Sequence, residues 1–259
     1  MHPMPTDSTT RFSNRVADYV KSRPSYPPAV IDVLRERIGF DATKIVADIG
    51  AGTGISSALF LAAGNRVLAV EPNAPMRAAA VAALGGDPNF AAIDGTAEAT
   101  TLPAASVDLI IAAQAFHWFN RPKFAAECRR IGRPGAHLLL LWNERLAVGS
   151  PFLVEYEQLL KDISADYSRV DHRNLTDAQI AEVFAAPPQL IDLPNEQTFD
   201  FEGLSARALS SSYFPPADDP RHTSAMAKLR EVFDRTNTHG TVTMRYTTQL
   251  HLGPVHRRG

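Results

Sequence analysis

The stretch Val46-Ala47-Asp48-Ile49-Gly50-Ala51-Gly52-Thr53-Gly54 decides how this chain folds. Its first half completes a short apolar run that begins at Lys44, which is typical of a buried parallel strand. Residues 55–63 then follow the spacing of a helix and stop at Gly64. Three alternate glycines between a strand and a helix let the backbone turn tightly and let a ligand approach main-chain atoms. The pattern predicts a cofactor site at the carboxyl edge of a doubly wound sheet.

Strand-like and helix-like segments alternate after this stretch. Short apolar runs predict further strands near residues 66–70, 90–93, 107–113 and 137–142. Helical spacing and helix-stopping residues predict helices over 28–38, 74–84 and 121–132. Alternating strands and helices specify an α/β fold in which helices cover both faces of a parallel sheet.

The pattern changes after residue 143. Helical spacing is found at 151–165, 176–185 and 221–236. Strand-like alternation is found at 199–201 and 241–252. We expect a single domain over 1–259 with an N-terminal lid segment at 1–27, a helical cap insertion at 143–190, and a sheet edge with substrate-side helices at 191–259.

Composition excludes several classes of function. The chain holds 26 basic and 28 acidic residues, for a formal net charge of −2, so it lacks the surplus of Lys and Arg that nonspecific nucleic-acid binding needs. A single cysteine, Cys128, excludes an intrachain disulfide and a cysteine zinc cluster, and no two histidines stand four residues apart. Residues 1–15 lack the apolar run of a secretory signal, and no apolar stretch approaches the roughly 20 residues that span a bilayer. We expect a cytoplasmic, metal-independent protein with a small-molecule partner, no nucleic-acid or membrane partner, and a monomeric or homodimeric state.

Two acids accompany the glycines. The dinucleotide fingerprint would require glycine at position 55, which is Ile55, so a nicotinamide cofactor is the weaker interpretation. Asp48 would repel a pyrophosphate and suits a ligand with an ammonium group. Glu71 ends the second predicted strand, where an acid accepts the hydroxyls of a ribose. The structural alternatives are a capping aspartate in a tight turn and a solvated surface glutamate.

These residues resemble a known family. Residues 46–54 resemble the first motif of class I S-adenosylmethionine-dependent methyltransferases, with Glu71 as the ribose acid. Asp94-Gly95-Thr96-Ala97-Glu98, followed by Leu102-Pro103, is similar to the third motif, which wraps the adenine. Ser106-Val107-Asp108-Leu109-Ile110 and Gln114-Ala115-Phe116-His117-Trp118-Phe119 resemble the fourth strand and its loop in the small-molecule subgroup, which includes methyltransferase type 11 and trans-aconitate methyltransferase-like enzymes. The resemblance covers roughly residues 11–145.

The resemblance implies a Rossmann-like, seven-stranded, mostly parallel sheet of order 3-2-1-4-5-7-6, with S-adenosylmethionine as cofactor. Thr96 departs from the acid that many relatives carry there, which favours backbone contacts with the adenine near Ala97. The expected cofactor-binding residues are Asp48, Gly50, Gly52, Gly54, Glu71, Pro72, Asn73, Met76, Thr96, Ala97, Glu98, Gln114, Ala115, Phe116, Tyr19 and Arg23.

The loop after the fourth strand carries the candidate chemistry. His117 is the candidate catalytic base, because it can take a proton from a hydroxyl or an amine, or it can donate to a carboxylate acceptor. The candidate residues of the substrate pocket are Trp118, Phe119, Tyr26 and Tyr213. The structural alternative is an aromatic loop that packs over the sheet edge. Arg145, Arg207 and His222 are further polar groups near the predicted substrate side, where a carboxylate acceptor would want an arginine.

The predicted function is transfer of a methyl group from S-adenosylmethionine to a small-molecule acceptor, with O- or carboxyl methylation favoured. Two alternatives stay open. One is a catalytically silent nucleotide-binding regulatory module, and the other is an NAD-dependent oxidoreductase.

Overall fold

The computed structural model describes residues 23–164, 175–211 and 213–257, which form one seven-stranded sheet. Its order is β3-β2-β1-β4-β5-β7-β6, as the family resemblance implied. The strands are β1 (Ile45–Ile49), β2 (Arg66–Val70), β3 (Phe90–Ile93), β4 (Val107–Ala113), β5 (Gly132–Arg145), β6 (Gln189–Phe199) and β7 (Val242–Pro254). Strands β1 to β5 pair in parallel, and β7 runs antiparallel to both β5 and β6.

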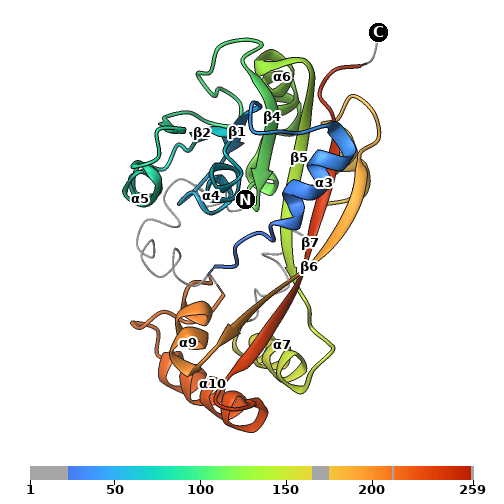
Figure 1. Cartoon of the computed structure of the whole chain (residues 1–259). Helices are drawn as coiled ribbons and strands as arrows, with labels where there is room; N and C mark the ends of the chain where they lie inside the picture. Colours follow the sequence, from blue (N-terminus) through green and yellow to red (C-terminus); the bar gives the residue numbers. More distant parts are fainter. Residues whose placement is uncertain (1–22, 165–174, 212, 258–259) are drawn as a thin grey trace, which may run out of the picture.

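The helices fall into two groups, which Figure 1 shows at opposite ends of the long strands β5, β6 and β7. The first group is α3 (Ala29–Ile38), α4 (Ile55–Ala62), α5 (Ala74–Leu84), the 3₁₀ helix η2 (Phe116–Trp118) and α6 (Arg121–Ile131). The second group is α7 (Pro151–Ile163), α9 (Phe201–Leu209) and α10 (His222–Thr236), while the short α8 (Asp177–Ala181) returns to the sheet. The second group lies beyond the carboxyl ends of the parallel strands, which is the side where α/β sheets bind ligands.

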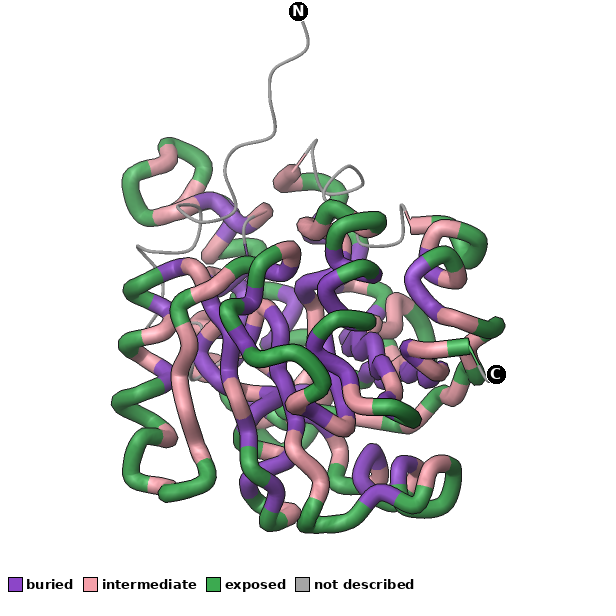
Figure 2. Tube along the Cα trace, turned by 90° about the horizontal axis from the view of Figure 1, so that it is seen from above, coloured by how far each residue is buried: buried purple, intermediate pink, exposed green. Residues whose placement is uncertain are grey.

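The sheet separates two hydrophobic cores, and successive residues of β5 alternate between them. Leu138, Leu140 and Trp142 pack with α6 on one face. Leu139 and Leu141 pack with α3 and α4 on the other face. Each fully buried Leu contributes about 1.5–3 kcal/mol by leaving water. Figure 2 shows the buried positions concentrated along the central strands and the exposed ones on the outer faces of the helices.

A third core holds the second helix group together. Its largest fully buried side chains include Tyr156 of α7 and Phe214, and it continues along β7 through Val242, Met244 and Tyr246. This core, here called the cap core, is separate from the two sheet cores. The long strands therefore carry a second small body beyond the parallel sheet.

The structure corrects the expected boundaries after residue 143. Of the expected strand at 199–201 only Phe199 is in a strand, because β6 ends there and α9 begins at Phe201. Between them Asp200 caps α9, since its side chain accepts a hydrogen bond from the Gly203 amide at 2.8 Å. The strand that pairs with β7 is instead residues 189–199, and α9 was not predicted. Helix α8 is also shorter than the expected 176–185.

Two features are absent from the described residues. Within residues 23–164, 175–211 and 213–257, none of the helices is long and apolar enough to cross a membrane. The same residues contain no group of three or more His, Cys, Asp or Glu side chains that could hold a metal ion. Tyr19 and most of the expected lid segment lie outside the described residues.

Candidate active site

The glycine loop connects β1 to α4 in a conformation that only glycine adopts easily. Gly50, Gly52 and Gly54 have φ values of 70°, 57° and 87°. The amide of Gly50 donates to the carbonyl of Val70 at 2.9 Å, which holds the start of the loop against the end of β2. A Cβ at Gly52 would meet only Met76 Sδ, at 3.9 Å. The middle of the loop therefore faces open space beside α5.

Glu71 follows β2 and holds this loop through its side chain. One carboxylate oxygen accepts from the amide of Gly52 and the other from the amide of Asn73, each at 2.8 Å. Glu71 is 7% exposed, and burial raises its pKa above the ordinary value even though these two amides lower it. A carboxylate has about four acceptor positions, so the two amides leave room for further donors such as ribose hydroxyls.

Asp48 lies inside the turn. Its side chain has no exposed surface, and one oxygen accepts from the hydroxyls of Ser56 and Ser57 at 2.7 Å each. The other oxygen has no hydrogen-bond partner among the described residues. Burial raises the pKa of Asp48 to about 6, and the charge of Glu71 adds to the rise. In this geometry Asp48 anchors the start of α4 beneath the loop, while its expected contact with a cofactor ammonium stays a prediction.

The segment after β3 is fixed at two places. At its start, Asp94 pairs with Arg77 of α5 at 3.1 Å, and Arg77 also donates to the carbonyl of Glu71. Thr96 and Ala99 then close a small turn around Ala97, which is 6% exposed. The segment therefore runs from the ribose acid to a buried alanine, where the adenine contact is expected.

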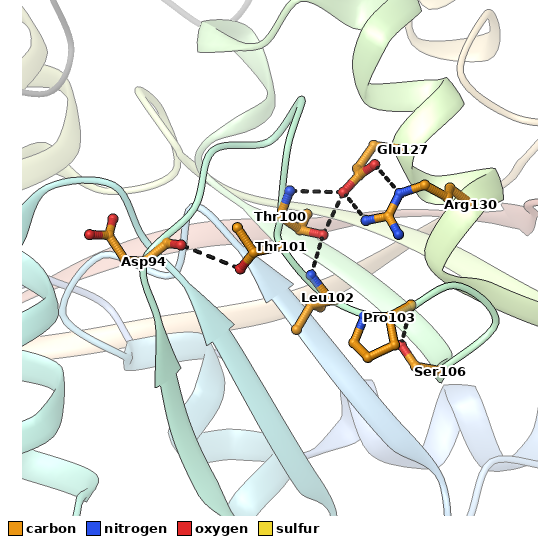
Figure 3. Close-up of polar contacts among 8 residues, drawn as sticks. All are labelled: Asp94, Thr100, Thr101, Leu102, Pro103, Ser106, Glu127 and Arg130. Atoms are coloured by element: carbon orange, nitrogen blue, oxygen red, sulfur yellow. Dashed lines mark hydrogen bonds and ion pairs between the residues drawn. The ribbon is translucent and has the colours of Figure 1, made fainter.

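Farther along, Glu127 connects this segment to α6 (Figure 3). One of its oxygens accepts from both the amide and the hydroxyl of Thr100, at 2.8 and 2.6 Å. The guanidinium of Arg130 donates to both oxygens of Glu127 at 2.7 Å. This ion pair lowers the pKa of Glu127 to about 2, although burial opposes the shift. Glu127 was not predicted as a functional residue, and its role is to position the loop.

The acceptor loop, residues 114–119, follows β4 and contacts the glycine loop. Gln114 begins it with a φ of 56°, a conformation that is uncommon outside glycine and frequent at functional sites. A Cβ added to Gly50 would lie 2.8 Å from Ala115 Cβ and 3.2 Å from the Phe119 ring. Glu98 accepts from the Asn120 amide at 2.8 Å, which connects this loop to the segment after β3. The glycine loop, Glu71 and the acceptor loop thus meet at the carboxyl ends of β1, β2 and β4. The segment after β3 joins them through Glu98.

The aromatic residues of this loop divide into two roles. Phe116 has no exposed surface and packs in the core against Phe124 and Trp142, so only its backbone is available to a ligand. The rings of His117 and Trp118 are half-buried and lie against each other, with centroids 4.9 Å apart. His117 is therefore held by a neighbouring aromatic face at the sheet's ligand-binding edge.

Asn143, near the end of β5, joins this loop to the start of the described chain. Its backbone carbonyl accepts from Gln114 Nε2 at 3.2 Å. Its side-chain amide donates to the carbonyl of Ser25 at 3.2 Å, and its side-chain oxygen accepts from the Thr248 hydroxyl of β7. Asn195 of β6 also donates to Ser25 and to Asn143. Sequence reasoning missed this hub because its partners are up to 118 residues away.

Comparison with known proteins agrees with this geometry. The methyltransferase domain family matches residues 47–140. An uncharacterised methyltransferase of Mycobacterium tuberculosis is 40% identical over 139 residues, which are 54% of each chain. An uncharacterised methyltransferase-like protein of Schizosaccharomyces pombe is 34% identical over 135 residues, or 52% of each chain. The chain thus matches about half the length of these curated relatives.

Residues 47–140 therefore match a methyltransferase domain, in agreement with the resemblance to the class I S-adenosylmethionine-dependent methyltransferases.

Solved structures of other proteins resemble the fold of about nine tenths of this chain. A proposed type II methyltransferase of Anaeromyxobacter dehalogenans has a TM-score of 0.70 and 23% identity, over 91% of this chain and 99% of that one. A proposed methyltransferase from an antibiotic biosynthesis pathway of Anabaena variabilis has a TM-score of 0.62 and 21% identity, over 90% and 99%. At such identities the likeness extends the methyltransferase fold to the second helix group and implies nothing about the acceptor.

The residues of the methyltransferase domain fit the family's cofactor, S-adenosylmethionine. Gly52 leaves open space where a side chain would stand, and the carboxylate of Glu71 borders it with acceptor capacity to spare. Pro72 and Asn73 follow at once, and Met76 lies beside Gly52. The glycine loop, the ribose acid and the acceptor loop therefore occupy one site. Individual contacts with the cofactor stay predictions.

The remaining expected residues are divided between a sheet core and the cap core. Arg23 donates to the carbonyl of Ser210 at 3.0 Å, and Tyr26 is buried beside α3. Tyr213 packs against the cap core. Arg23 and Tyr26 come from the segment before α3, which Asn143 contacts at Ser25, and Tyr213 comes from the segment between α9 and α10.

Proposed function

We propose that this methyltransferase domain transfers the methyl group of S-adenosylmethionine to a small-molecule acceptor, at an oxygen of a hydroxyl or a carboxylate. The observation that carries the proposal is the contact between the three segments. Glu71 fixes the glycine loop, and Ala115 and Phe119 of the acceptor loop pack on the same loop. A methyl donor held by Glu71 and the glycine loop would have its reacting end beside Ala115 and Phe119 of the acceptor loop.

Bound S-adenosylmethionine supplies a methyl group on a positively charged sulfur, so the transfer depends mainly on positioning. Gly52 and Glu71 hold the nucleoside end. Trp118 and Phe119 present aromatic faces to a cation, an attraction worth about 0.5–2 kcal/mol. His117 takes the proton of a hydroxyl acceptor as the new bond forms, whereas a carboxylate acceptor is already deprotonated and needs no base.

The setting of the reaction is part of the same proposal. The near-neutral charge balance supports a small molecule rather than a nucleic acid as acceptor. We propose that the enzyme acts in the cytoplasm, without a metal ion, as a monomer or a homodimer.

Methyl transfer tests the proposal directly. The chain is incubated with S-adenosylmethionine labelled in its methyl group and with fractionated small metabolites, and the labelled product is treated with base. A methyl ester releases its label in base and a methyl ether keeps it, so the same assay identifies the atom methylated. Label transfer that depends on the chain supports the proposal. Cofactor binding without transfer to any fraction would favour a silent binding module instead.

His117 is tested in the same assay. For a hydroxyl acceptor, His117→Ala is expected to lower turnover about 10²-fold or more while cofactor binding is unchanged. The control is His239→Asn, an exposed histidine between α10 and β7. Unchanged turnover of a hydroxyl acceptor in His117→Ala would remove His117 from the mechanism.

A further inference from the structure

The cap core contains a buried positive charge that forms no ion pair with a carboxylate of residues 23–164, 175–211 or 213–257. Arg207, in the last turn of α9, is 5% exposed. Its Nε lies 3.5 Å from the Tyr246 hydroxyl and its Nη1 lies 3.5 Å from the Ser210 hydroxyl. Both distances are at the limit for a hydrogen bond. Among the described residues no acid forms an ion pair with Arg207, and Nη2 has no hydrogen-bond acceptor.

A neighbouring arginine shows how this fold balances such a charge. Arg145, at the end of β5, is about as buried as Arg207 and forms an ion pair with Glu157 of α7. Its guanidinium also lies 5.2 Å from the centre of the Tyr156 ring. Arg207 has only hydroxyls and the carbonyl end of its own helix in place of a glutamate. Those partners offset little of the cost of removing a cation from water. Stabilisation of the fold therefore does not explain why a charged side chain is buried at position 207.

The surroundings of Arg207 supply hydroxyl groups. The phenol oxygens of Tyr246, Tyr213 and Tyr156 raise the pKa of Arg207 above its ordinary value, although burial lowers it. The cation is therefore charged at every physiological pH. The Tyr246 hydroxyl donates to Gln197 and the Ser210 hydroxyl donates to the carbonyl of Arg207, so the guanidinium is the group left to bind a ligand. One fixed positive charge matches a planar anion of single charge, which a guanidinium binds with two parallel hydrogen bonds.

The position of Arg207 connects it to the acceptor loop. Tyr246 and Thr248 lie two residues apart on one face of β7, about 7 Å along the strand. Thr248 donates to Asn143, and Asn143 accepts from Gln114 of the acceptor loop. From the other side, Ser210 contacts both Arg207 and Arg23. Figure 1 shows the segment that leads into α3 running between α9 and the sheet. A series of contacts through Tyr246 and Thr248 of β7 and then Asn143 thus connects Arg207 to the acceptor loop.

We propose that Arg207 binds a carboxylate of the methyl acceptor and so selects carboxylic acids as substrates. The proposal rests on the methyltransferase function proposed above, because the acceptor would lie between Arg207 and the acceptor loop. A phosphate dianion is the less suitable ligand, since Arg145 is already neutralised and Arg207 supplies a single charge.

The test compares anion binding in the wild-type chain and in Arg207→Met, both saturated with S-adenosylhomocysteine. The probes are glutarate, its neutral diamide, and inorganic phosphate, titrated by calorimetry at constant ionic strength. We expect glutarate to bind the wild-type chain, the diamide not to bind, and Arg207→Met to bind glutarate about 30-fold more weakly or not at all. Preferential binding of phosphate, or glutarate binding that survives in Arg207→Met, would overturn the proposal, as would no binding of glutarate.

Stability gives a second readout, which keeps the test decisive. Because Arg207 is an unbalanced buried charge, Arg207→Met is expected to melt at the same temperature as the wild-type chain or higher. Arg145→Met is the matched control and is expected to melt lower, because it leaves Glu157 buried without its cation. A large drop in the melting temperature of Arg207→Met would show that the arginine is structural and would overturn the proposal.

Binding of S-adenosylhomocysteine distinguishes a failure of the Arg207 proposal from a failure of the proposed methyltransferase function. Arg207→Met is expected to bind S-adenosylhomocysteine as the wild-type chain does. If the wild-type chain binds S-adenosylhomocysteine but not glutarate, the inference about Arg207 fails alone. If it binds neither, the proposed function fails as well.

Discussion

Replacement of Asp48 by Asn should change how the free energy of unfolding depends on pH. The folded carboxyl has a pKa of about 6, against 3.8 for an ordinary aspartate. Between these values the folded state holds a proton that the unfolded state has lost, so stability falls as the pH rises from about 4 to about 6. A shift of about two units corresponds to about 3 kcal/mol.

Asparagine keeps the shape of Asp48 and an oxygen for the hydroxyls of Ser56 and Ser57, but it does not titrate. The free energy of unfolding is measured in urea at several pH values between 4 and 8 for both proteins. The difference, wild type minus Asp48→Asn, should fall by about 2.4 kcal/mol between pH 4 and pH 7, because part of the full effect lies below pH 4, and stay level above pH 7.

Asp41→Asn is the control with the opposite sign. Asp41 is exposed, and its hydrogen bonds with Thr43 lower its pKa, so the wild-type chain should gain stability over this variant as the pH rises through the acid range. A difference between wild type and Asp48→Asn that is independent of pH would refute the reasoning. It would mean that Asp48 is ionised and solvated, as it would be if it faced the ligand rather than the interior of the turn.

Two further changes test how the loops are held. Glu127→Gln should destabilise the chain by about 1–3 kcal/mol at neutral pH, because it weakens the contacts with Thr100 and Arg130. In a urea series this loss should shrink as the pH falls from about 4.5 toward about 2, since wild-type Glu127 then takes up a proton; a loss that is constant with pH would contradict the ion pair. Gly50→Ala should cost about 1–2 kcal/mol for its left-handed backbone and about 1–3 kcal/mol for the clash with Ala115. Gly39→Ala, with a φ of 62° and open space, should cost only the first amount, so equal losses in the two glycine variants would argue against close packing of the two loops.

The parallel half of the fold could be predicted from the sequence because its signals are local. Apart from Asp48, residues 45–49 are apolar because β1 is covered on both faces. The glycines that follow are required because every second residue from Gly50 to Gly54 has a positive φ. Glu71 could be placed because the end of β2 lies beside the end of β1 in any doubly wound sheet. Sequence order and the geometry of a parallel sheet were sufficient there.

The second half could not be predicted with the same success, because its partners are distant in sequence. Strand β6 carries Pro194 and is exposed on alternate residues, so its apolar pattern is weak, and its register is set by β7 about fifty residues later. Asp200 is the only residue between β6 and α9. The alternation of apolar and polar residues across it therefore predicts a strand rather than a strand end and a helix start. The charge of Arg207 looks ordinary in the sequence, and only its burial, with no nearby acid among the described residues, marks it.

The most direct test of the central claim is calorimetric titration of the chain with S-adenosylhomocysteine, compared with NADH. The account predicts saturable binding of one S-adenosylhomocysteine per chain and none of NADH. Glu71→Ala should weaken that binding about tenfold or more, because it removes the carboxylate that holds Gly52 and that we propose to bind the ribose. Glu36→Ala, on the exposed side of α3, should bind as the wild-type chain does. Binding of NADH in preference, or equal affinity for S-adenosylhomocysteine in Glu71→Ala and the wild-type chain, would contradict the assignment of this loop as the cofactor site.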